Sequence, residues 1–250
     1  RAPGAPQAIF AVECVVDELC QHFNLDPLET RIKNAAKKGS VSSYGPTFDD
    51  IGLIATLEKA KKHPHYFAKL GPNQGRGLSC GFWFNFGGNT CVSLNVNFDG
   101  TVGIVEGNPD IGGSRASISQ MAAEELGIPL DKIRTIIADT NSLGHNDVTD
   151  GSRVTFAVGL ATIKAAKAAK KEMCKRAAKL WGIDEDAVYW ENGFAIPSGP
   201  NASDQDPLSF EKIASMSGQT GGPIAGHYEV NAEGAGVSFG VHLVDVPVDY

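Results

Sequence analysis

The sequence predicts an α+β protein, in which a helical lead-in is followed by a mixed α/β domain. Apolar residues between positions 8 and 63 recur at helical spacing, whereas after position 76 they alternate as in strands. One long helical pattern, residues 152–181, lies among the later strands, with small apolar residues on one side and lysines on the other. A hydrophobic fraction of 42% and a charged fraction of 20% are ordinary for a globular chain that buries a core.

The lead-in contains three predicted helices. The first begins near Pro6, and its apolar positions share one face: Ile9, Val12, Val15, Val16, Leu19 and Phe23. Asp26 predicts an N-cap for the second helix, which we expect to end at Gly39. The third is predicted over residues 49–63, and a connection rich in Pro and Gly, residues 64–75, then marks a boundary.

The second part alternates strands and helices. Asp99-Gly100 predicts a hairpin turn, preceded by Val92, Leu94, Val96 and Phe98 on one strand face. "SRASISQMAAEELGI" predicts a helix and "KIRTIIAD" a strand. Later elements are a short hairpin, a short helix and two strands: "AVYWENGFAIP", "DPLSFEKIASMS", "IAGHYEVN" and "GVSFGVHLVDVPVD".

Charge and composition exclude several functions. The net charge of −7 leaves no basic stripe for nucleic-acid phosphates. No apolar run approaches the ~20 residues of a membrane-spanning helix. The five cysteines form no CxxC pair, which predicts reduced thiols in a cytoplasmic protein and no metal site in this chain. The chain opens without Met and stops within a strand pattern, so we expect a piece of a longer protein.

Three glycine-containing loops precede helices, at residues 1–7, 108–115 and 149–155. In the last two, glycine would let a ligand approach the backbone, and the following helix would offer free N–H groups to an anion. A capped turn without a ligand remains an alternative for each loop. His145, in the acidic loop before the third one, either faces a substrate or lies in solvent.

Taken in order, these segments resemble the molybdenum-binding subunit of the xanthine oxidase and aldehyde oxidase family. The resemblance runs from Arg1 to about Ala169 and more loosely to the end. It is carried by the Arg-x-x-Gly-x-Pro-Gln loop and by four longer stretches: "AVECVVDELCQHFNLDPLETRIKNA", "GNPDIGGSR", "SQMAAEELGIPLDKIRTIIADTN" and "DGSRVTFAVGLA". It implies that residues 1–70 end a first molybdopterin-binding subdomain and that residues 71–250 form part of a second.

The resemblance also implies roles for single residues. Arg1 corresponds to the family's active-site arginine, and Gly4 and Gln7 belong to the same loop. The segment that touches the pterin corresponds to Ile111, Gly112 and Gly113. The segment that holds the pterin and its phosphate corresponds to Gly151, Ser152, Arg153, Val154 and Thr155.

Three departures from the family pattern matter. Many members have Gln where this chain has Gly113, so contact there would be through the backbone only. Copper-containing carbon monoxide dehydrogenases have Cys after the arginine, whereas Ala2 follows it here, which argues against a molybdenum–copper site. The family's catalytic Glu lies near the large subunit's C-terminus, and none of Glu124, Glu125 or Glu229 matches its context.

The resemblance implies a molybdenum hydroxylase that oxidises an aldehyde or N-heteroaromatic C–H bond with water-derived oxygen. The implied cofactor is molybdenum–molybdopterin, as a cytosine dinucleotide, and electrons would pass to Fe–S and FAD groups on other domains or subunits. Phe82, Trp83, Phe84 and His145 could line the substrate funnel. Two alternatives stay open: a non-catalytic module that carries molybdopterin or assists assembly, and a phosphate-binding domain unrelated to molybdenum.

Overall fold

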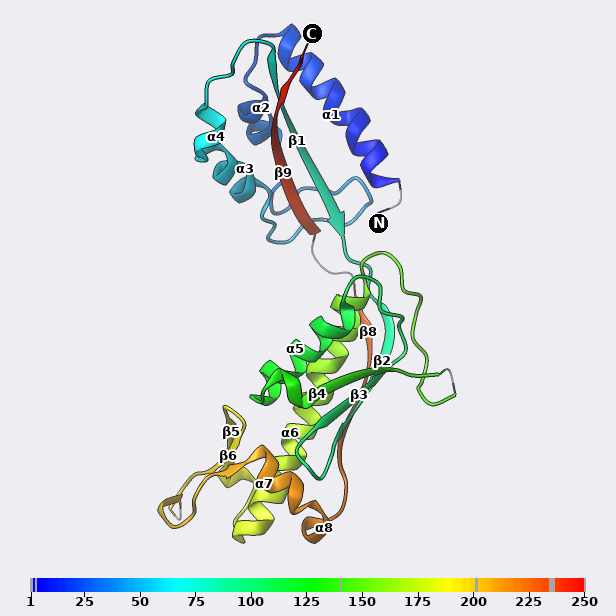
Figure 1. The fold of residues 1–250 in the computed structure, drawn as a ribbon, viewed down its shortest axis with the longest axis vertical. Coiled ribbons are helices and arrows are strands. Elements are labelled where there is room, and N and C mark those ends of the chain that lie inside the picture. The colour runs from blue at the N-terminus through cyan, green and yellow to red at the C-terminus, as the bar shows by residue number, and fades with distance from the viewer. Residues whose placement is uncertain (1, 3, 140, 201, 234–236, 250) are drawn as a thin grey trace. The chain divides into compact units, whose positions relative to one another are not determined.

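The chain folds into two compact units, each with its own core. The computed structural model describes residue 2 and residues 4–139, 141–200, 202–233 and 237–249. Residues 1–85 and 235–250 form the first unit, and residues 86–234 form the second (Figure 1). Both contain helices packed on strands, which confirms the expected α+β class. The expected subdomains, 1–70 and 71–250, concern a longer subunit and stay a prediction.

The first unit is built on a two-stranded antiparallel ribbon, because the last strand of the chain returns to the first. β1 (Gln74–Phe84) pairs with β9 (Val237–Pro247) over its whole length. The unit also contains four helices: α1 (Ala5–His22), α2 (Pro27–Asn34), α3 (Leu53–Lys61) and α4 (Pro64–Phe67). A small core joins α2, α3 and β1 through Leu28, Leu57 and Leu78.

Local sequence explains the helix ends in this unit. Asp26 caps α2 as predicted, accepting hydrogen bonds from the amides of Leu28 at 2.9 Å and Glu29 at 2.8 Å. The prediction that α2 ends at Gly39 was wrong, because Ala35 already has extended backbone and packs on the small core. The predicted helix 49–63 is shorter, since Gly52 precedes its first residue and Pro64 starts the separate turn α4.

The apolar face of α1 is largely exposed. The predicted helix forms, but its only fully buried residue is Cys20. Val12 is 60% exposed and Leu19 50% exposed, although both lie on the predicted apolar face. The helical period therefore identified which side chains share a face, and the described residues of the first unit leave most of that face uncovered.

The second unit contains a four-stranded mixed sheet in the order β4-β3-β2-β8. Its strands are β2 (Gly88–Val96), β3 (Val102–Glu106), β4 (Ile133–Ile137) and β8 (Ile224–Ala232). β2 pairs antiparallel with β3 and with β8, and the Asp99-Gly100 turn joins β2 to β3 as predicted. β3 and β4 are parallel neighbours, connected through α5 (Ser114–Leu126).

Two long helices cover one face of this sheet, α5 and α6 (Gly159–Trp181) (Figure 1). The core between helices and sheet includes Leu94, Ile104, Ile118 and Met173. Val92 and Leu94 are buried as predicted, but Phe98 is 67% exposed because it lies beyond the end of β2. The predicted helix 152–181 begins at Val154 with a five-residue π-helix, Val154–Val158, before α6 continues it.

A smaller three-stranded sheet and two short helices complete the second unit. The strands are β5 (Val188–Glu191), β6 (Phe194–Pro197) and β7 (Leu208–Ser209), and the helices are α7 (Phe210–Ser215) and α8 (Ser217–Thr220). Single 3₁₀ turns occur at Leu130–Lys132, Glu185–Ala187 and Ala202–Asp204. Of the helices in the described ranges, none combines the length and the apolar character that a membrane crossing requires.

Close contact between β8 and α6 generates a prediction. A Cβ atom on Gly226 would overlap the backbone carbonyl of Ala165 on α6. Because backbone atoms cannot move aside by changing rotamer, Gly226→Ala should lower the free energy of unfolding by on the order of 3 kcal/mol. Urea unfolding of the protein measures this change. The matched control is Gly103→Ala in β3, where no atom lies within 4 Å of the added carbon; equal losses in both variants would contradict the contact.

Candidate functional site

The two glycine loops of the second unit lie at one edge of the main sheet. β3 ends at Glu106 and β4 ends at Ile137, and because these strands are parallel, their carboxyl ends meet at the same edge. The amide of Ala138 donates to the carbonyl of Glu106 at 2.9 Å, and this bond holds the ends of β3 and β4 together. Such an edge is the usual place for ligands in sheets that contain parallel strands. Residues far apart in sequence therefore form one candidate site.

The loop before the π-helix presents two hydroxyl groups outward. Ser152 and Thr155 are exposed, whereas Gly151, Arg153 and Val154 are buried. Within the described part of the chain, neither hydroxyl forms a hydrogen bond. The first amides of a helix also lack partners within the helix, so this junction offers several donors in one place. The carboxylate of Asp150 accepts from the amide of Gly151 at 2.7 Å, so one donor of the junction is already used and the two hydroxyls stay exposed.

Gly151 allows the chain to make this turn. Gly151 and Ser152 both have a φ of 60°, in the left-handed region, which a side chain on Gly151 would strain. A Cβ there would also overlap the ring of Phe86. The carbonyl of Gly151 accepts a hydrogen bond from the amide of Phe86 at 3.1 Å. The turn is therefore packed tightly on the segment that leads into β2.

Arg153 does not reach outward but anchors the site from within. Its residue is 2% exposed, and its guanidinium donates to three carbonyls: Gly87 at 2.7 Å, Asn89 at 2.8 Å and Asp147 at 2.8 Å. A longer bond of 3.3 Å reaches the carbonyl of Val148. Burial lowers the pKa of Arg153, and the charge of the nearby Asp147 carboxylate opposes this shift. The guanidinium thus fixes the start of β2 against the acidic loop, which comprises residues 141–150.

The loop after β3 has the opposite chemical character. Asp110 accepts from the amide of Gly113 at 2.9 Å and from the hydroxyl of Ser114 at 3.1 Å, so a carboxylate already occupies the start of α5. Hydrogen bonding to Arg115 lowers the pKa of Asp110. This start of a helix is already neutralised by its own acid. The expectation of an anion at loop 108–115 therefore has less support than the same expectation at the junction.

Ile111, Gly112 and Gly113 form the exposed tip of this loop. Gly112 and Gly113 have φ values of 87° and 88°, and no atom lies within 4 Å of a Cβ added to Gly113. A ligand could therefore lie directly on the backbone at the tip.

Two buried side chains beneath the tip have unpaired acceptor atoms. Glu106 is 0% exposed and Asn108 is 2% exposed. One carboxylate oxygen of Glu106 accepts a hydrogen bond from the backbone N–H of Asn108 at 2.7 Å. The other oxygen, Oε1, and the side-chain oxygen Oδ1 of Asn108 have no hydrogen-bond partner. Burial raises the pKa of Glu106 to about 7. The base of this loop is therefore rich in acceptors and poor in donors.

The acidic loop lies against the start of β2, where the amide of Asp147 donates to the carbonyl of Asn89 at 2.9 Å. His145 is exposed and contacts Asp147 at 2.9 Å, and this hydrogen bond lowers the pKa of Asp147. A cavity of about 380 Å³ opens beside it, lined by Asn89, Thr90, Cys91, His145, Glu229, Val230 and Asn231. His145 is therefore both solvent-exposed and next to a polar cavity. Neither of the two sequence interpretations of this histidine is eliminated.

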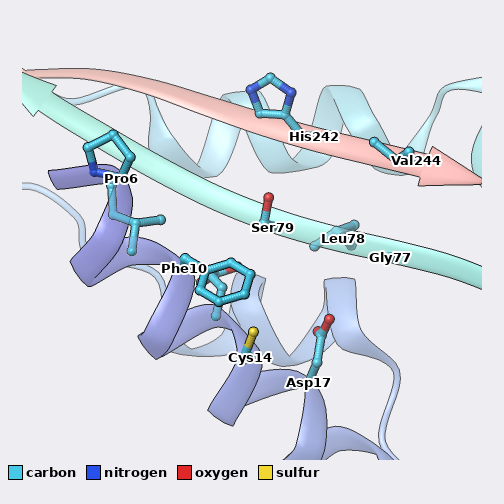
Figure 2. Close-up of a pocket in the computed structure, with 11 residues that line it drawn as sticks. Pro6, Phe10, Cys14, Asp17, Gly77, Leu78, Ser79, His242 and Val244 are labelled. Carbon is cyan, nitrogen blue, oxygen red and sulfur yellow. The ribbon is translucent and has the colours of Figure 1, made fainter. Parts of the chain in front are cut away.

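The loop predicted at the start of the chain belongs to the first unit. Arg1, the expected catalytic residue, lies outside the described residues. Gly4, with a φ of 85°, precedes the first turn of α1, and Gln7 is exposed within that turn. A groove of about 460 Å³ follows α1, between its Phe10 side and the β1–β9 ribbon. Figure 2 shows Phe10 and Cys14 facing Leu78 and Ser79 across it. Gly4 and Gln7 do not line this groove.

The aromatic residues suggested for a substrate funnel also lie in the first unit. Phe82, Trp83 and Phe84 are half-buried at the end of β1. Tyr44 stacks on Phe84, with ring centroids 4.8 Å apart. Their role in a funnel stays a prediction.

Sequence analysis missed Glu106 and Asn108. The motif "GNPDIGGSR" was recognised for its glycines, while Asn108 was treated only as part of a loop. A signal was present, since an acid and an amide directly after a buried strand stand at the edge where ligands bind.

Comparison with known proteins gives consistent results. A family model described as a molybdopterin cofactor-binding domain matches residues 54–250, and another of the same description matches residues 1–35. The xanthine dehydrogenase molybdenum-binding subunit of Escherichia coli O157:H7 is 27% identical over 100% of this chain and 35% of its own length. The aldehyde oxidoreductase molybdenum-binding subunit PaoC of Escherichia coli K12 is 31% identical over 56% of this chain and 20% of its own length. The chain thus spans between a fifth and about a third of the length of these relatives.

Solved structures show the same fold. A CO dehydrogenase from Oligotropha carboxidovorans matches 96% of this chain and 34% of its own, with a TM-score of 0.77 and 20% identity. The aldehyde oxidoreductase from Desulfovibrio gigas matches 98% of this chain and 27% of its own, with a TM-score of 0.69 and 18% identity. At these identities the similarity concerns the fold alone.

The raised pKa of Glu106 predicts a pH-dependent stability. In the unfolded chain this group loses its proton near its ordinary pKa of 4.5, whereas in the fold it keeps the proton to about 7. The free energy of unfolding should therefore fall by at most about 3 kcal/mol as the pH rises between these values. Above pH 7 this contribution should no longer change. Glu106→Gln should remove this fall and be more stable than the parent at pH 8.

Urea unfolding between pH 4 and pH 8 tests this expectation. Gln keeps an oxygen to accept from Asn108, so the main change is the loss of the titrating group. Glu191→Gln, on the exposed side of β5, controls for the loss of a negative charge. Parallel stability curves for Glu106→Gln and the parent would show that Glu106 ionises normally in the fold.

Proposed function

Since the chain belongs to the molybdopterin cofactor-binding domain family, we propose that it forms the cofactor-holding part of a molybdenum hydroxylase's large subunit. The family matches confirm the resemblance seen in the sequence. The observation that carries the proposal is that two predicted cofactor segments, distant in sequence, meet at one sheet edge. The junction presents two exposed hydroxyls, whereas the start of α5 after the other loop is occupied by the carboxylate of Asp110.

The junction at residues 151–155 fits a phosphate group. The hydroxyls of Ser152 and Thr155 are exposed and lack hydrogen-bond partners within the described residues. The positive end of the following helix and the buried cation of Arg153 favour a negative charge in front of them. Gly151 and Val154 are buried, and the amide of Gly151 already donates to Asp150 at 2.7 Å, so both would shape the turn that presents the hydroxyls. Arg153 would attract the phosphate through its charge without contacting it, because its guanidinium already donates to backbone carbonyls.

The tip of the loop after β3 fits a flat ring system that carries N–H donors, as a pterin does. Ile111, Gly112 and Gly113 are exposed, and open space faces Gly113. The carboxylate of Asp110 at the start of α5 would repel a phosphate here. The negative end of the cofactor is therefore assigned to the junction and the ring to the tip.

When bound, the molybdenum–molybdopterin group supplies the redox chemistry, and the protein binds and orients it. The proposed substrate is an aldehyde or an N-heteroaromatic compound, and the proposed cofactor form is the cytosine dinucleotide. Fe–S and FAD groups on other domains or subunits would accept electrons, alongside the remaining segments of the large subunit. The free thiols of the five cysteines support a cytoplasmic location.

Gly113 supports a second candidate, a non-catalytic module that carries the cofactor. The family's glutamine amide is absent here, and the φ of 88° would strain a side chain at this position. Such a module would hold pterin but show no turnover. Activity of the complete protein with aldehydes or N-heterocycles separates the two candidates.

The proposed phosphate contacts predict a loss of cofactor when both hydroxyls are removed. In the complete protein purified with its partners, molybdenum and pterin should be close to equimolar with the chain. Ser152→Ala combined with Thr155→Val should weaken cofactor retention roughly tenfold or more, because hydrogen bonds to a charged group are lost. Inductively coupled plasma mass spectrometry measures molybdenum, and fluorescence of the oxidised pterin measures the organic part.

A matched control is Thr56→Val, which removes a hydroxyl from the first turn of α3 in the other unit. Parent protein without molybdenum and pterin, from a host that loads such enzymes, would refute the proposed function. A doubly substituted protein that retains its pterin fully would remove Ser152 and Thr155 from the site.

Arg1 is proposed to place the substrate, on the family resemblance alone. Arg1→Ala in the complete protein should keep its pterin and lose turnover roughly 10²-fold, because a misplaced substrate reacts slowly. Steady-state rates and pterin content are measured on the same sample. Arg134→Ala, exposed on β4, is the control for loss of an arginine. Normal turnover in the Arg1 variant would exclude the residue from the site.

A further inference from the structure

The side chain of Asn108 connects the loop after β3 to the segment that leads into the junction. Its side-chain nitrogen donates to the carbonyl of Asp147 at 2.8 Å and to the hydroxyl of Thr149 at 3.0 Å. Asn108 begins the loop that carries Ile111–Gly113, and Thr149 lies two residues before the junction at 151–155. Both hydrogens of the Asn108 side-chain amide therefore form bonds to the segment 147–149, which leads into the junction.

The orientation of the Asn108 amide follows from its partners. A backbone carbonyl can only accept, so the amide nitrogen must face Asp147. The amide oxygen is then left in the interior without a partner, next to a buried acid in the same turn. An unpaired buried acceptor is costly, so the two donated bonds are what hold this side chain in place.

The carbonyl of Asp147 is shared with a second donor. It accepts from Asn108 and from Arg153, each at 2.8 Å. Arg153 continues the connection to the carbonyls of Gly87 and Asn89 at the start of β2. One backbone oxygen therefore links the end of β3, the acidic loop and the start of the π-helix.

We infer that Asn108 is a positioning residue, which fixes the separation of the loop tip at 111–113 from the junction at 151–155. The inference rests on the proposed function, since it concerns how two segments would grip one cofactor. Asn108 itself does not touch the cofactor, because it is 2% exposed beneath the tip. An asparagine is required because aspartate lacks the donors and an apolar residue lacks both donors and acceptor.

Packing of α5 on α6 offers another route by which the two segments could be held. Met121 of α5 lies directly on Gly159 of α6, close to the π-helix. If helix packing alone fixed the separation, loss of the Asn108 bonds would leave both segments unchanged. The two routes therefore predict different outcomes for the same substitution.

Hydrogen–deuterium exchange on the complete protein tests the inference. Asn108→Ala should raise amide exchange roughly tenfold in both segments, residues 111–113 and 152–155, since the bonds that couple them are lost. Thr149→Val should raise exchange in the same segments, Thr149→Ser should restore parental rates, and the double variant should add little to Asn108→Ala. The matched control is Asn97→Ala, which removes an amide bond of 2.9 Å to the hydroxyl of Thr101 at the β2–β3 turn.

Cofactor retention provides the second measurement. Asn108→Ala should release pterin several-fold faster than the parent, while its thermal midpoint stays close to that of Asn97→Ala. Unchanged exchange in either segment, or a parental rate of pterin release, would overturn the inference. Parent protein without pterin would refute the proposed function instead, and the exchange experiment would still decide whether Asn108 couples the two segments.

Discussion

The site depends on the burial of one positive charge. Moving a guanidinium out of water is costly unless its donors are satisfied, and burial lowers the pKa of Arg153 although the charge of the nearby Asp147 carboxylate opposes this shift. Backbone carbonyls accept its hydrogen bonds, from Gly87 and Asn89 on one side and Asp147 on the other. These carbonyls can serve only if the acidic loop folds back onto the start of β2. The need to satisfy the hydrogen-bond donors of Arg153 therefore fixes the course of the acidic loop, which has no regular secondary structure.

The same charge gives the two glycine loops different roles. At the junction, two exposed hydroxyls and the start of a long helix place donors outward above a buried cation, while Asp150 accepts from the amide of Gly151 at 2.7 Å. At the loop after β3, Asp110 neutralises the helix start, and the buried Glu106 adds acceptor atoms below the tip. Both loops looked alike in sequence, as glycines followed by a helix. Their side-chain acids make the chemical difference that orients an asymmetric ligand.

Much of the fold was predictable because its signals are local. The cap at Asp26, the turn at Asp99-Gly100 and the buried face of α6 depend on residues within a few positions of each other. The exposure of Val12 was not predictable, because a helical period does not reveal whether a partner covers the face. The role of Asn108 was hidden for another reason. Its partners are brought near by the parallel pairing of β3 and β4, and one of them is a backbone carbonyl, which leaves no residue signature.

The two units differ in how much apolar surface stabilises them. In the first unit the fully buried core consists of Leu28, Leu57 and Leu78, while Phe10 on α1 remains 71% exposed. Apolar surface that stays in water adds nothing to the stability of a fold. In the second unit, α5 and α6 bury a continuous core against the sheet, from Leu94 to Met173. The paired loops at its edge rest on this core, and the hydrogen bonds of Asn108 connect them to each other. Precise placement of an anion and a ring at one sheet edge requires such a rigid support.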